Sequence, residues 1–159
     1  MTTKPRATVP TPDLDERHLS AWRALLHAHA AVVERIEHDL AAAHRLPLGS
    51  YDVLFALAEA PQRRLRMREL ARAIVLNRST LTRRVDRLER EGLLAREPCG
   101  ADRRGADAVL TERGRAALRA AWPVYARGIA TYFAAHLSAD EARALADALG
   151  RVYAAAEQG

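Results

Sequence analysis

The segment RSTLTRRVDRLEREG, from Arg78 to Gly92, restricts the fold of this chain more than any other. Its apolar residues Leu81, Val85 and Leu88 recur at i, i+4 and i+7, the spacing that places side chains on one side of an α-helix. The five arginines of the segment fall mostly on the remaining circumference. Such a helix buries only a narrow stripe, so it has to lie on the surface of a domain whose core comes from other segments.

Helical periodicity also predicts the elements before this segment. The first 12 residues are rich in proline and threonine, have nothing to pack, and are expected to form a flexible tail. We expect, in chain order, a long helix that starts near residues 13–19 and ends before Pro47, a helix capped by Gly49 or Ser50 and closed by Pro61, a short strand around Leu65 and Met67, and a short helix that contains Leu70, Ala71 and Ile74.

The sequence changes in character after Gly92, which suits the left-handed conformation that ends many helices. Two short extended runs, residues 93–97 and 107–110, flank a charged centre that contains Gly100 and Gly105. This pattern predicts a β-hairpin. The predicted fold class is therefore mainly α with a small β-hairpin.

Two helices are expected after the hairpin. Thr111 can cap a long helix that runs to Leu137, and Pro123 and Gly128 are expected to bend it. The sequence SADE from Ser138 has the Ser-x-x-Glu form of a capping box, which predicts the start of a last helix.

A short helix followed by a tight connection and a second, arginine-rich helix is typical of the helix-turn-helix, whose second helix enters the major groove of DNA. Hydroxyl and amide side chains near the start of that helix suit contacts with phosphates and bases, and Asn77 is also its expected N-cap. The candidates are Asn77, Ser79, Thr80 and Thr82. Arg83 suits guanine, whereas Arg78, Arg84 and Arg87 suit phosphates at the flanks of the groove.

The alternative is a solvated surface helix without a ligand. Arg83, and Arg87 or Arg90, could then pair with Asp86, Glu89 and Glu91 three or four residues away. The distribution of charge favours the DNA-binding interpretation. Residues 63–104 contain 13 basic and 6 acidic residues, whereas the rest of the chain has 12 basic and 14 acidic ones. The tip of the hairpin adds Arg103 and Arg104, which could reach a minor groove or phosphates.

Composition and motifs argue against other classes of protein. No Gly-x-Ser-x-Gly, His-Glu-x-x-His or phosphate-loop motif occurs, so an enzyme is not predicted, and neither is a cofactor. His27 and His29 point apart on a helix and cannot share a metal ion. One cysteine, Cys99, and the lack of a long apolar run predict a soluble cytoplasmic protein without contact with a membrane.

Three stretches in order resemble the MarR-type winged helix-turn-helix transcription regulators. They are MRELARAI, RSTLTRRVDRLEREGLL and, most specifically, DRRGADAVLTERG, which is similar to the family's wing signature of Asp-x-Arg, a strand and Leu-Thr-x-x-Gly. Ala108 departs from the signature, which commonly has a larger aliphatic residue there. The resemblance covers about residues 14–156.

The resemblance implies a homodimer that binds a pseudopalindromic operator in double-stranded DNA. We expect this regulator to be a repressor. It implies four regions: a tail (1–12), an N-terminal dimerisation helix (13–47), a winged domain (48–112) with recognition helix 78–91 and wing 98–107, and C-terminal dimerisation helices (113–157). By position, Ser79, Thr82, Arg83 and Arg87 fall on the recognition helix and Asp102 and Arg104 on the wing. Asp102 is expected to orient Arg104, although it could also be an ordinary turn residue.

The resemblance further implies release of DNA by a small aromatic or phenolic effector. Trp22, His29, Tyr51 and Tyr125 could line its pocket, and the alternative is that these aromatic side chains are core or dimer-interface residues. Two other functions stay open: a regulator that acts without a ligand or through oxidation of Cys99, and a basic protein-interaction module.

Overall fold

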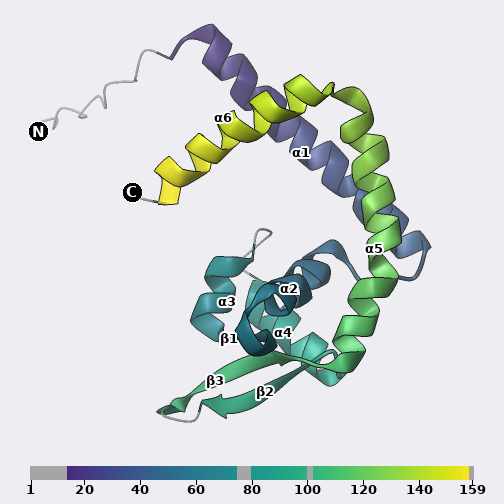
Figure 1. The fold of residues 1–159 in the computed structure, drawn as a ribbon, viewed down its shortest axis with the longest axis vertical. Helices are drawn as coiled ribbons and strands as arrows, with labels where there is room; N and C mark the ends of the chain where they lie inside the picture. Colours follow the sequence, from purple (N-terminus) through teal and green to yellow (C-terminus); the bar gives the residue numbers. More distant parts are fainter. Residues whose placement is uncertain (1–13, 75–79, 100–101, 158–159) are drawn as a thin grey trace, which may run out of the picture. The chain divides into compact units, whose positions relative to one another are not determined.

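The computed structural model of the protein describes residues 14–74, 80–99 and 102–157, and the side chains of residues 99 and 102–105 are not described. The predicted tail at residues 1–12 lies outside this part of the chain. Helices dominate, as predicted, and three short strands form one small sheet (Figure 1). The elements are α1 (Glu16–Ala42), α2 (Leu48–Glu59), η1 (Pro61–Arg63), β1 (Arg64–Arg66), α3 (Met67–Ala73), α4 (Leu81–Arg90), β2 (Leu94–Cys99), β3 (Asp102–Leu110), α5 (Glu112–Tyr132), η3 (Ala134–His136) and α6 (Ala139–Glu157).

Contacts divide the chain into two compact units, residues 1–31 and 32–159. The described part of the first unit is the N-terminal stretch of α1, on which Trp22 and Leu26 are exposed. The second unit contains the rest of α1 and all other elements. Its core is built from α2, α3, α4, the sheet and the parts of α1 and α5 that pack on them.

Helix α2 begins at Leu48, so the prediction that Gly49 or Ser50 caps it is wrong. Pro47 is the N-cap residue, with φ −54° and ψ 144°. The side chain of Glu37, from α1, accepts a hydrogen bond from the Leu48 N–H at 3.1 Å. A carboxylate from a neighbouring helix thus takes the place of a local cap, because it satisfies one free N–H and suits the positive end of the helix dipole. Ser50 lies inside the first turn and is buried.

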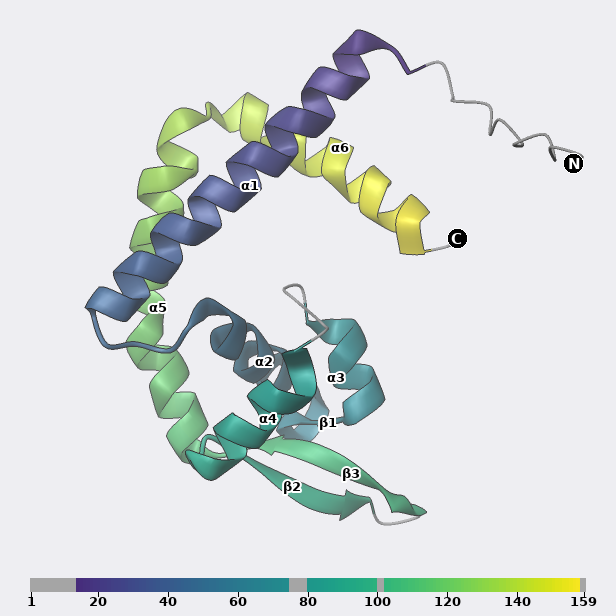
Figure 2. The same ribbon diagram turned by 180° about the vertical axis from the view of Figure 1, so that it is seen from behind.

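The sheet has the order β1-β3-β2, with both neighbouring pairs antiparallel. Strands β2 and β3 form the predicted hairpin and extend together away from α2, α3 and α4 (Figures 1 and 2). Strand β3 is longer than predicted, and a register irregularity separates Pro98 from Cys99. Ala108 is fully buried in a continuous strand, opposite Leu65 of β1 and Arg96 of β2, so its small side chain does not interrupt the wing.

The apolar stripe of the arginine-rich helix is confirmed. Leu81, Val85 and Leu88 are buried, with the last two completely inaccessible to solvent. They join a core to which the other helices and the sheet contribute, including Leu54, Leu57, Leu70 and Leu94. The core therefore holds α4 by one side only, and the opposite side of α4 remains exposed.

Two later predictions need correction or refinement. Helix α5 ends at Tyr132 instead of Leu137, and a short 3-10 turn precedes α6. Helix α5 runs without interruption through Pro123 and Gly128. A Cβ atom on Gly128 would lie 2.7 Å from Cγ1 of Ile36 in α1, so this glycine allows the two helices to approach closely.

The predicted capping box of α6 is confirmed, since the Ser138 N–H donates to Glu141 at 2.8 Å and the Glu141 N–H donates to the Ser138 hydroxyl at 3.3 Å.

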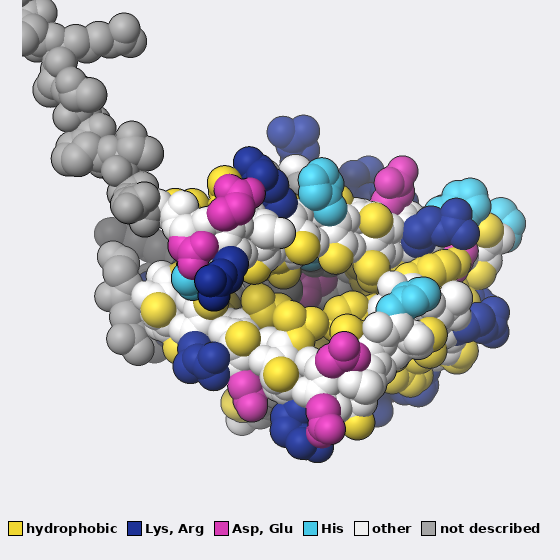
Figure 3. Space-filling model, turned by 90° about the horizontal axis from the view of Figure 1, so that it is seen from above, with side chains coloured by type: hydrophobic (Ala, Val, Ile, Leu, Met, Phe, Trp, Pro, Cys, Tyr) yellow, Lys and Arg dark blue, Asp and Glu magenta, His cyan; other side chains and the backbone are white. Residues whose placement is uncertain are grey.

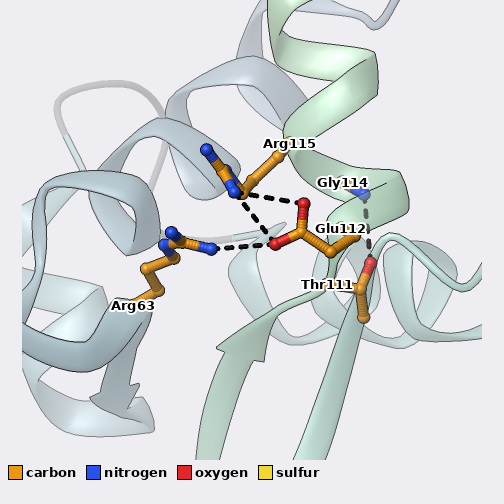
Figure 4. Close-up of polar contacts among 5 residues, drawn as sticks. All are labelled: Arg63, Thr111, Glu112, Gly114 and Arg115. Atoms are coloured by element: carbon orange, nitrogen blue, oxygen red, sulfur yellow. Dashed lines mark hydrogen bonds and ion pairs between the residues drawn. The ribbon is translucent and has the colours of Figure 1, made fainter.

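Thr111 joins three elements at the base of the hairpin. Its Oγ1 accepts a hydrogen bond from the Gly114 N–H at 3.0 Å, which caps α5 as predicted (Figure 4). The same hydroxyl donates to the carbonyl of Gly92 at 2.8 Å. Gly92, with φ +69°, has the predicted left-handed conformation just after α4. One side chain thus ties the end of α4 and the end of β3 to the start of α5.

Gly114 is required by this junction. A Cβ atom there would lie 2.0 Å from the carbonyl oxygen of Leu93 and 2.7 Å from Cδ1 of Leu110, so the backbone of the junction would have to move. We therefore expect Gly114→Ala to lower the free energy of unfolding by more than about 2 kcal/mol, measured by urea denaturation at fixed protein concentration. Gly150→Ala in α6 is the matched control, because its Cβ meets nothing within 4 Å. The control should be neutral or stabilising by up to about 1 kcal/mol, and equal effects of the two substitutions would contradict the packing role of Gly114.

Candidate DNA-binding surface

Helices α3 and α4 form the predicted pair of helices, and α4 carries the predicted contact residues. Residues 75–79, and with them the predicted contact residues Asn77, Arg78 and Ser79, lie outside the described residues. Regular α-helix begins at Leu81, with Thr80 as the N-cap residue, which is later than the predicted start at residue 78.

The outer side of α4 presents Thr82, Arg83, Arg87 and Arg90, all of them exposed. Arg83 has no carboxylate partner among the described residues. Because the buried stripe fixes the rotation of the helix, these side chains face away from the core. The predicted phase of α4 is therefore confirmed, and Arg83 is a guanidinium available to a ligand.

The structure gives Arg84 of α4 a different environment from the predicted one. Its side chain is partly buried and packs on the first turn of α2, where a Cβ on Gly49 would lie 2.6 Å from its Cζ. Its Nη1 is buried and has no hydrogen-bond partner among the described residues. Arg84 thus packs α4 against α2, because its position three residues after Leu81 turns it towards the core, and its contact with phosphate stays a prediction.

Arg87 and Arg90 are exposed but not free. Arg87 Nε donates to Glu91 at 2.7 Å, one of the pairs that the surface-helix alternative predicts, and this carboxylate holds the pKa of Arg87 above its ordinary value. Arg90 Nε donates to the backbone carbonyl of Asp86 at 3.3 Å. Arg87 can contact phosphate only by leaving or sharing its partner.

The other two acidic side chains of α4 do not pair with arginines of the same helix. Asp86 and Glu89 both bind Arg96 of β2, at 2.5 Å. Sequence reasoning overlooked Arg96, since this contact depends on how the start of the hairpin, strand β2, lies beside α4. The two carboxylates are thereby neutralised in part and directed towards the hairpin.

The base of the hairpin is held by ion pairs across the sheet. Glu97 lies opposite Asp107, and Arg64 of β1 binds both, at 2.6 Å and 3.8 Å. One guanidinium thus relieves the repulsion between two facing carboxylates. Arg63, just before β1, binds Glu112 at the start of α5 at 2.9 Å, and Arg115 binds the same carboxylate, which lowers the pKa of Glu112 (Figure 4).

Residues 100 and 101 at the tip of the hairpin lie outside the described residues, and only the backbone is described for residues 99 and 102–105. Asp102 begins β3 and is paired with Cys99, and Arg103 and Arg104 follow it in the strand. The predicted contact between Asp102 and Arg104 lies outside the described side chains.

The structure brings together two of the four predicted effector residues. The rings of Tyr51 and Tyr125 meet edge to face with their centroids 5.0 Å apart. Burial raises the pKa of both phenols, so both are neutral at physiological pH. Trp22 and His29 belong to the other unit of the chain and are exposed.

Phe55 and Trp122 extend this pair into a cluster of four aromatic side chains. Phe55 stacks on Tyr51 at 6.0 Å, and Trp122 meets Tyr125 at 6.1 Å. Both are about half exposed. Their spacing from the tyrosines, four residues along α2 and three along α5, is a helical signal that could have identified them in the sequence.

Other kinds of site are not apparent in the described part of the chain. It contains no group of three or more His, Cys, Asp or Glu side chains suited to a metal ion. None of its helices is long and apolar enough to cross a membrane. The helix pair, the exposed arginines and the hairpin together define a winged helix-turn-helix protein.

Comparison with known proteins agrees with this class. A sequence profile of the MarR family matches residues 44–105. AbsC, a MarR family transcriptional regulator of Streptomyces coelicolor, is 30% identical, with 94% of this chain and 100% of AbsC covered and a TM-score of 0.81. Sco3205, a MarR family regulator of the same organism solved in complex with DNA, is 31% identical, with 88% of each chain covered and a TM-score of 0.79.

A curated relative matches over a shorter length. The HTH-type transcriptional regulator PecS of Dickeya dadantii is 31% identical over 105 residues, which are 65% of this chain and 62% of PecS. The chain thus spans less than two thirds of the length of PecS. With the two structural relatives, these matches show that the chain belongs to the MarR family of DNA-binding transcriptional regulators.

The pair between Arg87 and Glu91 leads to a first prediction about binding. Glu91→Gln should leave the Arg87 guanidinium free for phosphate and raise the affinity for duplex DNA about twofold, since an exposed i,i+4 pair is worth only about 0.3–0.5 kcal/mol. The measurement is fluorescence anisotropy with a labelled duplex at low salt. Asp140→Asn, which removes an exposed carboxylate paired with Arg143 in α6, is the control. An equal gain in the control would mean that the change in net charge alone is responsible.

Proposed function

We propose that the protein is a homodimeric repressor that binds a pseudopalindromic operator, with α4 in the major groove. The observation that carries this proposal is the outer side of α4, where Thr82 and Arg83 are exposed while Asp86 and Glu89 are bound by Arg96. A polyanion can approach such a surface, because its arginines are accessible and two of its carboxylates are partly neutralised. Asn77, Arg78, Ser79 and Thr80 remain candidates for contacts at the start of the helix.

We propose the same division of the chain into regions that the family resemblance implies. Residues 48–112 would form the winged domain, with wing residues 98–107, and residues 13–47 and 113–157 would supply the dimerisation helices. In the wing, Arg103 and Arg104 would contact phosphates or the minor groove, and Asp102 would orient Arg104 by a charge-assisted hydrogen bond.

Dimerisation is supported by apolar side chains that the described chain leaves uncovered. None of the residues of α6 is buried, and Val152 and Tyr153 are more than half exposed. Trp122 of α5 and Phe133, the residue that follows α5, are exposed as well. Figure 3 shows many hydrophobic side chains on the surface of the helices seen from above. Exposed apolar helix faces of this extent are typical of protein interfaces, and a second copy of the chain is the partner that a palindromic operator requires.

We further propose that a small aromatic or phenolic effector regulates binding. The support is the cluster of Tyr51, Phe55, Trp122 and Tyr125, since aromatic rings and neutral phenols suit such a ligand. Trp22 and His29 of α1 are the further candidates. A screen of phenolic compounds for release of bound DNA tests this part of the proposal.

Two substitutions test the reading of DNA. The DNA sequence that the protein recognises is first identified by selection from a pool of random duplexes. Arg83→Ala should then weaken binding of the selected duplex about 5- to 150-fold and that of a scrambled duplex much less, because one base contact is worth about 1–3 kcal/mol of discrimination. Arg104→Ala should weaken binding to both duplexes more evenly. It should also reduce the slope of log affinity against log salt concentration by about one, the value for one phosphate contact. If neither variant changes binding, the contact residues are wrongly assigned.

The dimer is tested by its mass. Sedimentation equilibrium at micromolar concentration should give twice the mass of the chain. Val152→Asp should shift the protein towards the monomer and lower the affinity for a palindrome, because it places a charge in the proposed interface. Arg151→Gln changes the neighbouring exposed residue and should leave the mass unchanged. A monomeric wild-type protein would refute the dimer.

A further inference from the structure

Arg96 of β2 makes three hydrogen bonds to two acidic side chains of α4. Its Nη2 binds Asp86 Oδ1 and its Nη1 binds Glu89 Oε2, each at 2.5 Å. Its backbone N–H also donates to the other oxygen of Glu89, at 3.2 Å. The side chain of Arg96 is 28% exposed, and those of Asp86 and Glu89 are 48% and 37% exposed, so the guanidinium is the more shielded side of both ion pairs.

The geometry of these contacts restrains α4 in two ways. Asp86 and Glu89 are three residues apart and lie on the same side of the helix. A single ion pair would fix only a distance, whereas a planar guanidinium that holds two such carboxylates also opposes rotation of the helix about its axis. Lysine has a compact ammonium group and cannot reproduce this fork.

Arg96 also affects the charge of the surface that faces DNA. Without it, Asp86 and Glu89 would stand uncompensated on the helix that carries Arg83. Two effects therefore have to be separated: the orientation of α4 relative to the hairpin, and the local electrostatic potential. The two effects predict different results. A change in electrostatic potential alters the affinity for every duplex, whereas a change in the orientation of α4 alters the discrimination between DNA sequences.

We infer that Arg96 is a positioning residue for DNA recognition: by binding Asp86 and Glu89 together, it fixes the orientation of α4 on the hairpin, so that the helix and the wing meet DNA in one register. Arg96 itself need not touch DNA. This inference rests on the proposed role of α4 as the recognition helix, and it adds a determinant of specificity in the wing strand β2.

The test compares Arg96→Lys and the double variant Asp86→Asn, Glu89→Gln. Each is measured by fluorescence anisotropy with the selected duplex and a scrambled duplex of equal length, at one salt concentration. Arg96→Lys keeps the charge, and we expect the ratio of the two affinities to fall about tenfold, the scale of one charged hydrogen bond. The double variant makes the helix more positive, yet the same ratio should fall. If potential alone mattered, the double variant would bind both duplexes more tightly with an unchanged ratio.

Two controls make the outcome decisive. Arg143→Lys changes an arginine that pairs with Asp140 in α6 and should leave the ratio unchanged. Loss of folded protein, followed by circular dichroism, would weaken binding to both duplexes equally and would not alter the ratio. An unchanged ratio in both folded variants would overturn the role of Arg96. Arg83→Ala in the same assay separates this inference from the proposed function on which it rests. If Arg83→Ala also leaves the ratio of affinities unchanged, the proposal that α4 is the recognition helix is wrong. If Arg83→Ala lowers the ratio while the Arg96 and Asp86/Glu89 variants do not, only the inference about Arg96 is wrong.

Discussion

The hydroxyl of Thr111 is the contact on which the arrangement of the winged domain depends. It caps α5 through the Gly114 N–H and binds the carbonyl that follows α4 at Gly92. The absence of a side chain at Gly114 lets the start of α5 rest on the Leu93 carbonyl. The Leu-Thr-x-x-Gly sequence therefore has a physical explanation in this chain. In this chain it ends β3, starts α5 and holds the end of α4 in one place.

The charges of α4 are sorted by its fixed rotation. Once the buried stripe is in the core, Arg83 faces solvent, Arg84 packs on α2, and Arg87 finds Glu91 one turn along the helix. The acidic residues Asp86 and Glu89 are taken up by the hairpin. A helix with several charges of both signs thus becomes a surface with an accessible guanidinium, and this separation is what binding to a polyanion requires.

Much of the fold could be predicted from periodicity and from a few local signals. The stripe of Leu81, Val85 and Leu88 and the cap at Thr111 are correct because spacing and capping are properties of neighbouring residues. The prediction that Gly49 or Ser50 caps α2 is wrong because the capping group, Glu37, comes from another helix. The prediction for Arg84 did not anticipate that a glycine in α2 leaves room for its guanidinium.

The sequence by itself determined which segments become helices and strands, which side of α4 is buried, and the family to which the chain is similar, since these depend on the order and spacing of residues in one stretch. Only the tertiary structure decided that Arg84 packs on α2 and that Arg96 binds the acidic residues Asp86 and Glu89. Those outcomes depend on Arg96 and Gly49, which lie in other elements and reach α4 only after the chain has folded. The spacing along a helix fixes where a side chain points, and the neighbouring elements fix what it meets.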